Sequence, residues 1–318
     1  MTLPSAPPTL EIAHEASVLR FAPQHGGLLL SWVLDGQPVI HWPHDADWRQ
    51  PNKIRGGNPL LFPFLGRHFV DGQIGRWRDA EGIVRELPMH GFARNLPFAA
   101  QIDDTQHSMR LTLTDSAATH PGYPFGFRFE ACYRLIGCDT LEVTLTTTNT
   151  GGAGLPSGLP SGLPSGLPSR LPYYAGHHFY FALPHEQRST TVLSMPASVR
   201  RHQLADGSIS PAEGGAPRYT LDEARIDDRF HCLEGPPQQP VQLIAPGLKR
   251  VISLDLNRPG AVPWYAVTTW AETTEADYYC IEPWLGLPDA IHNGEGLRWL
   301  EPGQSETAAL RIKVTALD

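Results

Sequence analysis

Apolar and polar residues alternate with a period of two along most of the chain. Met109, Leu111 and Leu113 alternate with polar neighbours, and the same pattern runs through residues 127–135 and 141–146. Successive side chains of a β-strand point to opposite faces, so this period predicts strands with one buried face. Further strands, rich in β-branched and aromatic residues, are predicted at 28–33, 39–42, 250–256, 264–270 and 310–316.

Helical periodicity is rare in this sequence. No amphipathic pattern exceeds two turns, and residues 221–225 are the one short candidate for a helix. The 30 glycines and 31 prolines punctuate the apolar runs, as in a chain with many turns. Many short strands separated by turns predict an all-β sandwich or barrel, and we expect one β-sandwich domain over residues 1–318.

Four copies of Gly-Leu-Pro-Ser interrupt this pattern at residues 154–169. The repeat has no periodicity that could bury one face, and its prolines exclude a helix or a central strand. We expect a surface loop lengthened by repeat expansion, because each doubling of a loop costs only about 0.6 kcal/mol in closure entropy. The alternative is a functional segment, either a lid or a ligand for a proline-binding protein.

The charge balance narrows the class of partner. The chain has 25 Lys and Arg against 33 Asp and Glu, a net charge of −8, which argues against nucleic acid or an anionic membrane and favours a small ligand. No apolar run approaches the ~20 residues that span a bilayer, and the first eight residues lack signal-peptide features. We therefore expect a cytoplasmic protein, with Cys132 and Cys280 as reduced core residues.

One carboxylate stands out at the end of an aromatic run. Residues 278–281 are apolar, Glu282 follows, and Pro283 is expected to stop regular pairing because proline lacks a backbone N–H. Glu282 should then lie at the end of a strand. It is either a catalytic group facing a ligand above the sheet or a solvated edge-strand glutamate.

Three further stretches hold candidate residues. Residues 54–67 form a glycine- and proline-rich loop, residues 88–94 place a histidine against a glycine, and residues 174–184 form an aromatic strand. Strand parity puts His178 on one face of that strand and His177 on the other. Each histidine could equally be a hydrogen-bonded structural residue.

A metal site is not predicted. His177, His178, His185 and Glu186 are similar to the histidine cluster of cupins. Adjacent strand residues point to opposite faces, however, and His177 and His178 could not both reach one ion without a bulge.

Four motifs occur together in a set order: G-G-x-P-L-L-F-P-x-x-G-R, H-G-F-A-R, G-x-H-x-x-F and C-I-E-P-W-x-G-x-P-D. Together they resemble the aldose 1-epimerase (mutarotase) superfamily over most of the chain, from about Arg55 to the last strand. The resemblance implies a large antiparallel β-supersandwich of the galactose mutarotase type, with the active site in a groove on one sheet. That fold agrees with the all-β prediction from periodicity.

The resemblance also implies roles for individual residues. Glu282 would be the general base, His178 the general acid and His90 the second active-site histidine. Arg67 would hydrogen-bond sugar hydroxyls, and Asp228 would contact the sugar, although Asp227 is adjacent to it. Two departures from the family pattern affect the surroundings of the predicted acid: a phenylalanine follows it where many members have proline, and the repeat lengthens the connection before it.

These residue types suit the interconversion of the α and β anomers of an aldose. A carboxylate can remove the proton of the C1 hydroxyl while an imidazolium protonates the ring oxygen, each transfer contributing roughly 10²–10⁴-fold. Both groups titrate in a range that works near neutral pH, so no cofactor is expected. Trp284, Phe92 and Tyr180 would stack on the apolar face of a pyranose, or else pack in the core.

The substrate stays open between two branches of the family. The motif P-D-A-x-x-N resembles enzymes for free sugars, whereas I-R-G-G-N-P-L-L-F-P resembles the branch acting on hexose 6-phosphates. Arg55 and Arg94 would then grip a phosphate, or else form structural salt bridges. We predict an aldose 1-epimerase, with a hexose-6-phosphate 1-epimerase as the alternative and a non-catalytic sugar-binding module as a further one. The expected partner is a sugar or sugar phosphate, and the oligomeric state is open.

Overall fold

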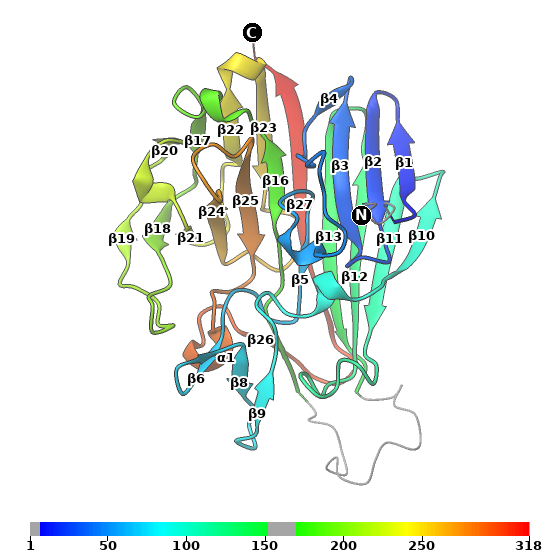
Figure 1. Ribbon diagram of the computed structural model, residues 1–318, viewed down its shortest axis with the longest axis vertical. Coiled ribbons are helices and arrows are strands. Elements are labelled where there is room, and N and C mark those ends of the chain that lie inside the picture. The colour runs from blue at the N-terminus through cyan, green and yellow to red at the C-terminus, as the bar shows by residue number, and fades with distance from the viewer. Residues whose placement is uncertain (1–6, 152–169, 318) are drawn as a thin grey trace.

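Two large antiparallel sheets dominate the structure, a computed structural model that describes residues 7–151 and 170–317 (Figure 1). This architecture confirms the predicted all-β supersandwich. The expectation of one domain over residues 1–318 stays a prediction. The Gly-Leu-Pro-Ser repeat at 154–169 lies outside the described residues, so its predicted role as a surface loop is not tested.

The first large sheet has nine strands. In spatial order they are β10 (Ala99–Asp103), β11 (Ser108–Thr114), β12 (Phe127–Leu135), β13 (Thr140–Asn149), β27 (Ser305–Ala316), β23 (Arg250–Asp255), β22 (Val241–Ala245), β17 (Val192–Ser194) and β20 (Arg218–Thr220).

The second large sheet positions the candidate site. Its order is β19 (Glu213–Gly214), β18 (Ser198–Arg201), β21 (Arg229–Leu233), β24 (Ala266–Trp270), β25 (Tyr278–Trp284), β15 (Gly176–His177) and β5 (Leu60–Leu61), and β16 (Phe179–Ala182) also pairs with β25.

Smaller elements complete the described fold. A four-stranded sheet contains β1 (Leu10–His14), β2 (Ser17–Ala22), β3 (Leu28–Leu34) and β4 (Gln37–Pro38). The two-stranded sheets are β14 (Leu171–Tyr173) with β26 (Arg298–Leu300), β6 (Phe69–Val70) with β7 (Gln73–Ile74), and β8 (Arg76–Arg78) with β9 (Val84–Glu86). The helical segments are α1 (Ala290–Asn293) and the 3-10 turns η1 (Pro51–Lys53), η2 (Ala93–Asn95), η3 (His185–Gln187), η4 (Ala224–Ile226) and η5 (Pro246–Leu248).

The strand predictions are confirmed where alternation is strict. Met109, Leu111 and Leu113 are all buried in β11, and β12 and β13 cover the other two alternating runs. Two local predictions are wrong. Residues 39–42 contribute only an isolated bridge between Ile40 and Phe181, and the helix expected at 221–225 is replaced by the 3-10 turn η4, shifted toward the C-terminus.

One apolar core joins the two large sheets. Phe62, which follows β5, stacks on Phe129 of β12 with ring centroids 4.3 Å apart and an interplanar angle of 10°. Such pairs contribute about 0.5–1.5 kcal/mol beyond the burial of their area. The core therefore fixes the second sheet, whose other face carries the site, against the first.

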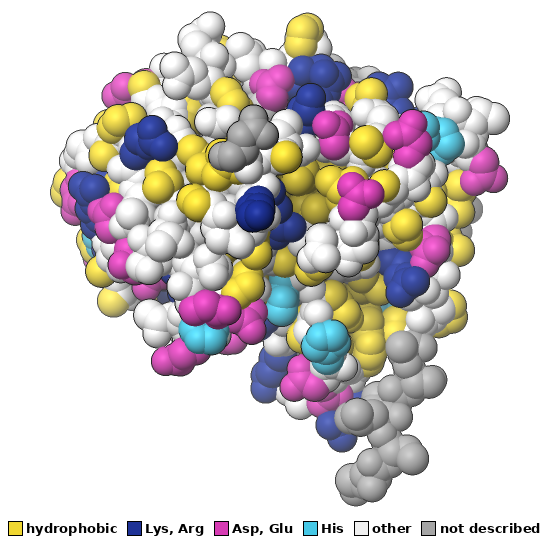
Figure 2. All heavy atoms as spheres, turned by 90° about the horizontal axis from the view of Figure 1, so that it is seen from above, with side chains coloured by type: hydrophobic (Ala, Val, Ile, Leu, Met, Phe, Trp, Pro, Cys, Tyr) yellow, Lys and Arg dark blue, Asp and Glu magenta, His cyan; other side chains and the backbone are white. Residues whose placement is uncertain are grey.

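Among residues 7–151 and 170–317, no helix combines the length and apolar character needed to cross a bilayer. Figure 2 shows one end of the molecule, where acidic and basic side chains are interspersed and do not form one continuous basic surface.

Candidate active site

The register of β25 places His178 directly opposite Glu282. On one side of β25, Glu282 pairs with Thr268 of β24. On the other side, β15 and β16 keep the same register, with Gly176 opposite Trp284 and Phe179 opposite Ile281. Residues opposite each other in an antiparallel pair point to the same face. His178, Glu282 and Thr268 therefore form a row across one face of the sheet.

Pro283 does not end the strand, contrary to the expectation from sequence, because β25 continues through it to Trp284. The Trp284 carbonyl accepts the Tyr265 N–H on the β24 side of the strand. The backbone groups of successive residues point to opposite sides, so the backbone nitrogen of Pro283 points toward β15. There the His177 carbonyl accepts the indole N–H of Trp284 at 3.2 Å in place of a proline donor. The missing N–H is thus replaced, and Glu282 lies inside a strand with 1 % of its surface exposed.

All eight predicted site residues line one cleft of about 290 Å³ over this face. They come from β25, the break between β15 and β16, the loops at 54–67 and 88–94, and the residue before β21. The set is Glu282, His178, His90, Arg67, Asp228, Arg55, Arg94 and Trp284.

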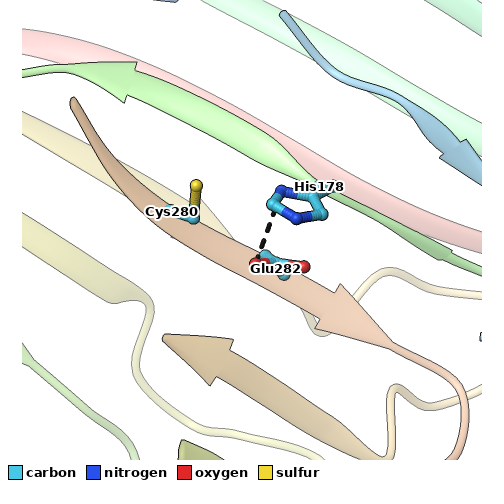
Figure 3. Close-up of side chains that lie close together, drawn as sticks. All are labelled: His178, Cys280 and Glu282. Atoms are coloured by element: carbon cyan, nitrogen blue, oxygen red, sulfur yellow. Dashed lines mark ion pairs between the residues drawn. The ribbon is translucent and has the colours of Figure 1, made fainter. Parts of the chain in front are cut away.

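Glu282 and His178 both line the cleft and form a buried ion pair, drawn as a dashed line in Figure 3. The carboxylate Oε1 lies 3.4 Å from the imidazole Nδ1, and His178 is 9 % exposed. Burial raises the pKa of Glu282 well above its usual value, and the negative charge of Asp228 raises it further. Burial lowers the pKa of His178 to about 3, assisted by the positive charges of Arg94 and Arg55. These opposite shifts favour a neutral pair that holds one proton on the carboxyl group.

The His90 ring is held in one neutral tautomer. Its Nδ1 accepts the backbone N–H of Gly66 at 3.1 Å, so the ring proton is on Nε2. Burial lowers the pKa of His90 well below its usual value, and the charge of Arg94 adds to that effect. The His90 backbone is left-handed, with φ 65°, a conformation that is uncommon for residues other than glycine. His90 can therefore donate a hydrogen bond from Nε2 as a neutral group.

Asn58 is a positioning residue that the sequence analysis did not identify. Its buried amide bridges the two large sheets: Nδ2 donates to the Tyr133 hydroxyl at 2.9 Å and to His177 Nδ1 at 3.0 Å, and Oδ1 accepts the His178 N–H at 2.9 Å. His177 lies on the opposite face from His178, stacked on Phe179, as strand parity predicts. In the sequence, Asn58 stands between two glycines and a proline in a tight loop. An amide that is buried in such a loop needs hydrogen-bond partners, and this could have marked Asn58 as a candidate.

The three arginines of the cleft differ in their partners. Arg55 pairs with Glu272 at 2.9 Å, which fits the alternative of a structural salt bridge. Arg67 donates from Nε to Gln203 at 3.2 Å. Arg94 has no acidic partner among the described residues, and its buried Nε makes no hydrogen bond there. Burial lowers the pKa of Arg94, so this guanidinium gains most from an anion in the cleft.

The geometry also separates Asp228 from its neighbour. Asp228 lines the cleft with φ 48°, whereas Asp227 does not line it. Trp284 lies over Gly176, where a Cβ atom would come within 2.7 Å of the indole ring. Further cleft residues that the sequence analysis missed are Thr268, Gln203 and Trp270.

Side chains that can bind metal ions lie close together at two places in the described part of the chain. One group joins His178, Cys280 and Glu282, and the other joins His185, Glu186 and Asp277 on the surface. The cluster considered from sequence is not one site, because His177 and His178 face opposite sides and His185 pairs with Asp277 at 2.9 Å.

Comparison with known proteins gives matches to part of the sequence. Residues 8–159 match the family model described as "Aldose 1-epimerase". Two curated proteins, from Salmonella typhimurium and Escherichia coli K12, carry the name "Putative glucose-6-phosphate 1-epimerase" and are each 30% identical over 114 residues. The match covers 35% of this chain and 34% of each relative, so the chain spans about a third of the length of the curated relatives it matches.

Solved structures share the fold over almost the whole chain. The Slr1438 protein of Synechocystis sp. PCC 6803 is 24% identical with a TM-score of 0.79, covering 99% of this chain and 98% of its own. A galactose mutarotase related enzyme from Lactobacillus acidophilus is 21% identical with a TM-score of 0.76, covering 98% of both chains. A galactose mutarotase-like protein from Lactobacillus casei is 20% identical with a TM-score of 0.74, covering 97% of this chain and all of its own (100%).

Proposed function

We propose that the chain is a member of the aldose 1-epimerase superfamily and an isomerase that interconverts the α and β anomers of an aldose, supported by the match of residues 8–159 to that family model and by the shared fold. The observation that carries the proposal is the pairing of Glu282 with His178 at 3.4 Å, within one cleft that His90 also lines. An acid and a base with shifted pKa values in the same cleft are typical of proton-transfer catalysis.

Ring opening moves two protons and breaks one bond. With the pair in its charged form, the Glu282 carboxylate takes the proton of the C1 hydroxyl while the His178 imidazolium gives its proton to the ring oxygen. The C1–O5 bond breaks and an open-chain aldehyde forms. The pair is then neutral, with the proton on Glu282, and the total number of protons on it has not changed.

Ring closure uses the neutral pair in reverse. After rotation about the C1–C2 bond, the ring oxygen attacks the other face of the aldehyde. His178 takes the proton of the attacking hydroxyl, and Glu282 returns its proton to the C1 oxygen. The pKa directions favour this neutral form in the buried site, so burial prepares the pair for closure. His90 donates its Nε2 hydrogen to the sugar oxygens without changing its own charge.

Anomer exchange measured by polarimetry or NMR tests the proposal. Glu282→Gln keeps the shape of the side chain but removes the base, and we expect the rate to fall roughly 10²–10⁴-fold. Glu86→Gln, an exposed acidic residue away from the cleft, is the matched control. A wild-type protein no faster than the uncatalysed exchange would support the sugar-binding module instead.

A hexose 6-phosphate is the second candidate substrate. The supporting observation is Arg94, whose guanidinium is mostly enclosed and has no acidic partner among the described residues, with Arg55 also lining the cleft. A phosphate would supply the missing charge-assisted hydrogen bonds. Arg94→Gln should then reduce kcat/KM for glucose 6-phosphate about 10–100-fold more than for glucose, as one such bond contributes about 1.5–3 kcal/mol.

The matched control for the phosphate test is Arg128→Gln, because Arg128 is half-exposed on β12 and does not line the cleft. Equal losses on both sugars in Arg94→Gln would count against the phosphorylated substrate. They would leave the epimerase proposal intact.

A further inference from the structure

Cys280 is a buried thiol beside the catalytic pair that the proposed reaction does not use. It is a free cysteine with 0 % of its surface exposed. It precedes Glu282 by two residues on β25, so both side chains point to the same face of the sheet. Across the neighbouring strands it pairs with Tyr180 and Trp270, both of which line the cleft.

The three side chains converge to a distance suited to one metal ion. One ligand atom each from His178, Cys280 and Glu282 lies within 4.8 Å of the other two (Figure 3). In a tetrahedral zinc site with bonds of about 2.0–2.3 Å, ligand atoms are separated by about 3.3–3.6 Å. The His178 Nδ1 and Glu282 Oε1 atoms are already 3.4 Å apart.

Two buried atoms of this group make no hydrogen bond with any described residue. Nδ1 of His178 and Oε2 of Glu282 make no hydrogen bond in the described structure, although both residues are at least nine-tenths buried. Leaving such a group unsatisfied costs about 1–3 kcal/mol. A cation bound by His178 Nδ1 and Glu282 Oε1 would give the imidazole nitrogen the partner that it lacks.

We propose that His178, Cys280 and Glu282 bind a thiophilic divalent ion of the zinc class. The ion would enter from the cleft, and its fourth coordination position would face the cleft. A thiolate and an imidazole favour zinc. Magnesium and calcium require several oxygen ligands, and this group supplies only one carboxylate. On binding, the thiol and the protonated carboxyl would each release one proton.

Occupation of this site inhibits the reaction, because the ion takes the lone pairs of both the acid and the base. The binding itself stands independently of the proposed function, and only the inhibition rests on it. The two are therefore measured separately.

Cobalt(II) absorption tests the binding directly. Co²⁺ replaces Zn²⁺ in tetrahedral sites and gives a thiolate charge-transfer band when cysteine is a ligand. We expect this band in the wild-type protein, with one ion displaced by Zn²⁺ and not by Mg²⁺. It should be lost in Cys280→Ala and kept in Cys232→Ala, a matched control with a buried thiol outside the group. A band that persists in Cys280→Ala, or no band in the wild type, would overturn the proposal.

Zinc titration of anomer exchange tests the inhibition. Each variant is compared with its own zinc-free rate, so a change in basal activity does not affect the result. We expect the Zn²⁺ concentration for half-inhibition to rise at least about 100-fold in Cys280→Ala, since loss of even an outer-shell partner costs about 10–100-fold in metal affinity. It should be unchanged in Cys232→Ala and in His185→Ala, which removes the surface group. Unchanged sensitivity in Cys280→Ala would refute inhibition at this site.

Two controls keep the outcomes distinct. Thermal unfolding of the metal-free Cys280→Ala protein shows whether it is folded, and Cys280→Ser serves as a second variant that fills the site and should also lose the thiolate band. A protein that binds Co²⁺ through Cys280 but shows no anomer exchange would disprove the proposed function and leave the metal site standing.

Discussion

Removal of the Asn58 amide should lower both the stability of the fold and the rate of anomer exchange. Asn58→Ala deletes three buried hydrogen bonds, to the Tyr133 hydroxyl, the His177 ring and the His178 N–H. At about 0.5–1.5 kcal/mol each, the free energy of unfolding should fall by about 2–4 kcal/mol. Urea unfolding followed by fluorescence measures this loss.

The same substitution should slow anomer exchange. Without the bond from Asn58, the break between β15 and β16 has no side-chain anchor at His178, and the imidazole is free to shift relative to Glu282. A displacement of about 1 Å can cost 10²-fold in rate, so we expect a fall of about 10–100-fold in kcat. Asn58→Asp keeps an oxygen for the His178 N–H and should retain more activity than Asn58→Ala.

Tyr133→Phe is the matched control, because it removes one of the three bonds and leaves the bonds of Asn58 to the His177 ring and the His178 N–H. Its stability should fall by about 1 kcal/mol, with the rate near that of the wild type. If Asn58→Ala exchanged anomers as fast as Tyr133→Phe, Asn58 would not position His178.

Three further predictions concern residues at or next to the cleft. Gly66→Ala should lower the free energy of unfolding by about 1–3 kcal/mol and slow anomer exchange, because Gly66 has φ 73° and an added Cβ would lie 2.6 Å from Pro288. Anomer exchange at the wild-type rate would contradict the role of the Gly66 N–H in orienting His90. Trp284→Phe leaves the His177 carbonyl without its indole donor, so we expect the free energy of unfolding, measured in urea, to fall by about 1–3 kcal/mol. A decrease below about 0.5 kcal/mol, the usual effect of a neutral surface substitution, would show that the hydrogen bond is dispensable. Burial lowers the pKa of His177 to about 3, so the stability contributed by the neutral ring is present above pH ~6.5 and is lost as the pH falls toward 3. Between pH 7 and 4.5, the free energy of unfolding should drop by about 2–3 kcal/mol more in the wild type than in His177→Gln. Parallel pH profiles of the two proteins would refute this.

Local patterns predicted the strictly alternating strands and the faces of their side chains. The alternation around His178 correctly put it on the opposite face from His177, and the run before Glu282 correctly predicted a strand. These properties depend on residues close in sequence. The structure brings the predicted residues into one cleft, while their catalytic and binding roles stay predictions.

The missed features depend on pairing between distant segments. The sequence analysis ended the strand at Pro283 because it considered the strand alone, whereas the indole of Trp284 supplies the missing donor. Asn58 acts on strands more than 70 residues away in the chain, at Tyr133 and His177, and no local pattern predicts those partners. The position of Cys280 beside His178 likewise follows from the register of β25 against β16.

The central claim is that Glu282 and His178 act as one proton-sharing unit, and a double-mutant cycle tests it most directly. Anomer exchange is measured for Glu282→Gln, His178→Gln and the double variant, on glucose and on glucose 6-phosphate. Residues that act as a unit are strongly non-additive, so the double variant should be about as slow as the slower single variant. Independent losses that multiply in the double variant would contradict the shared proton, and wild-type exchange in either single variant would contradict the catalytic pair itself.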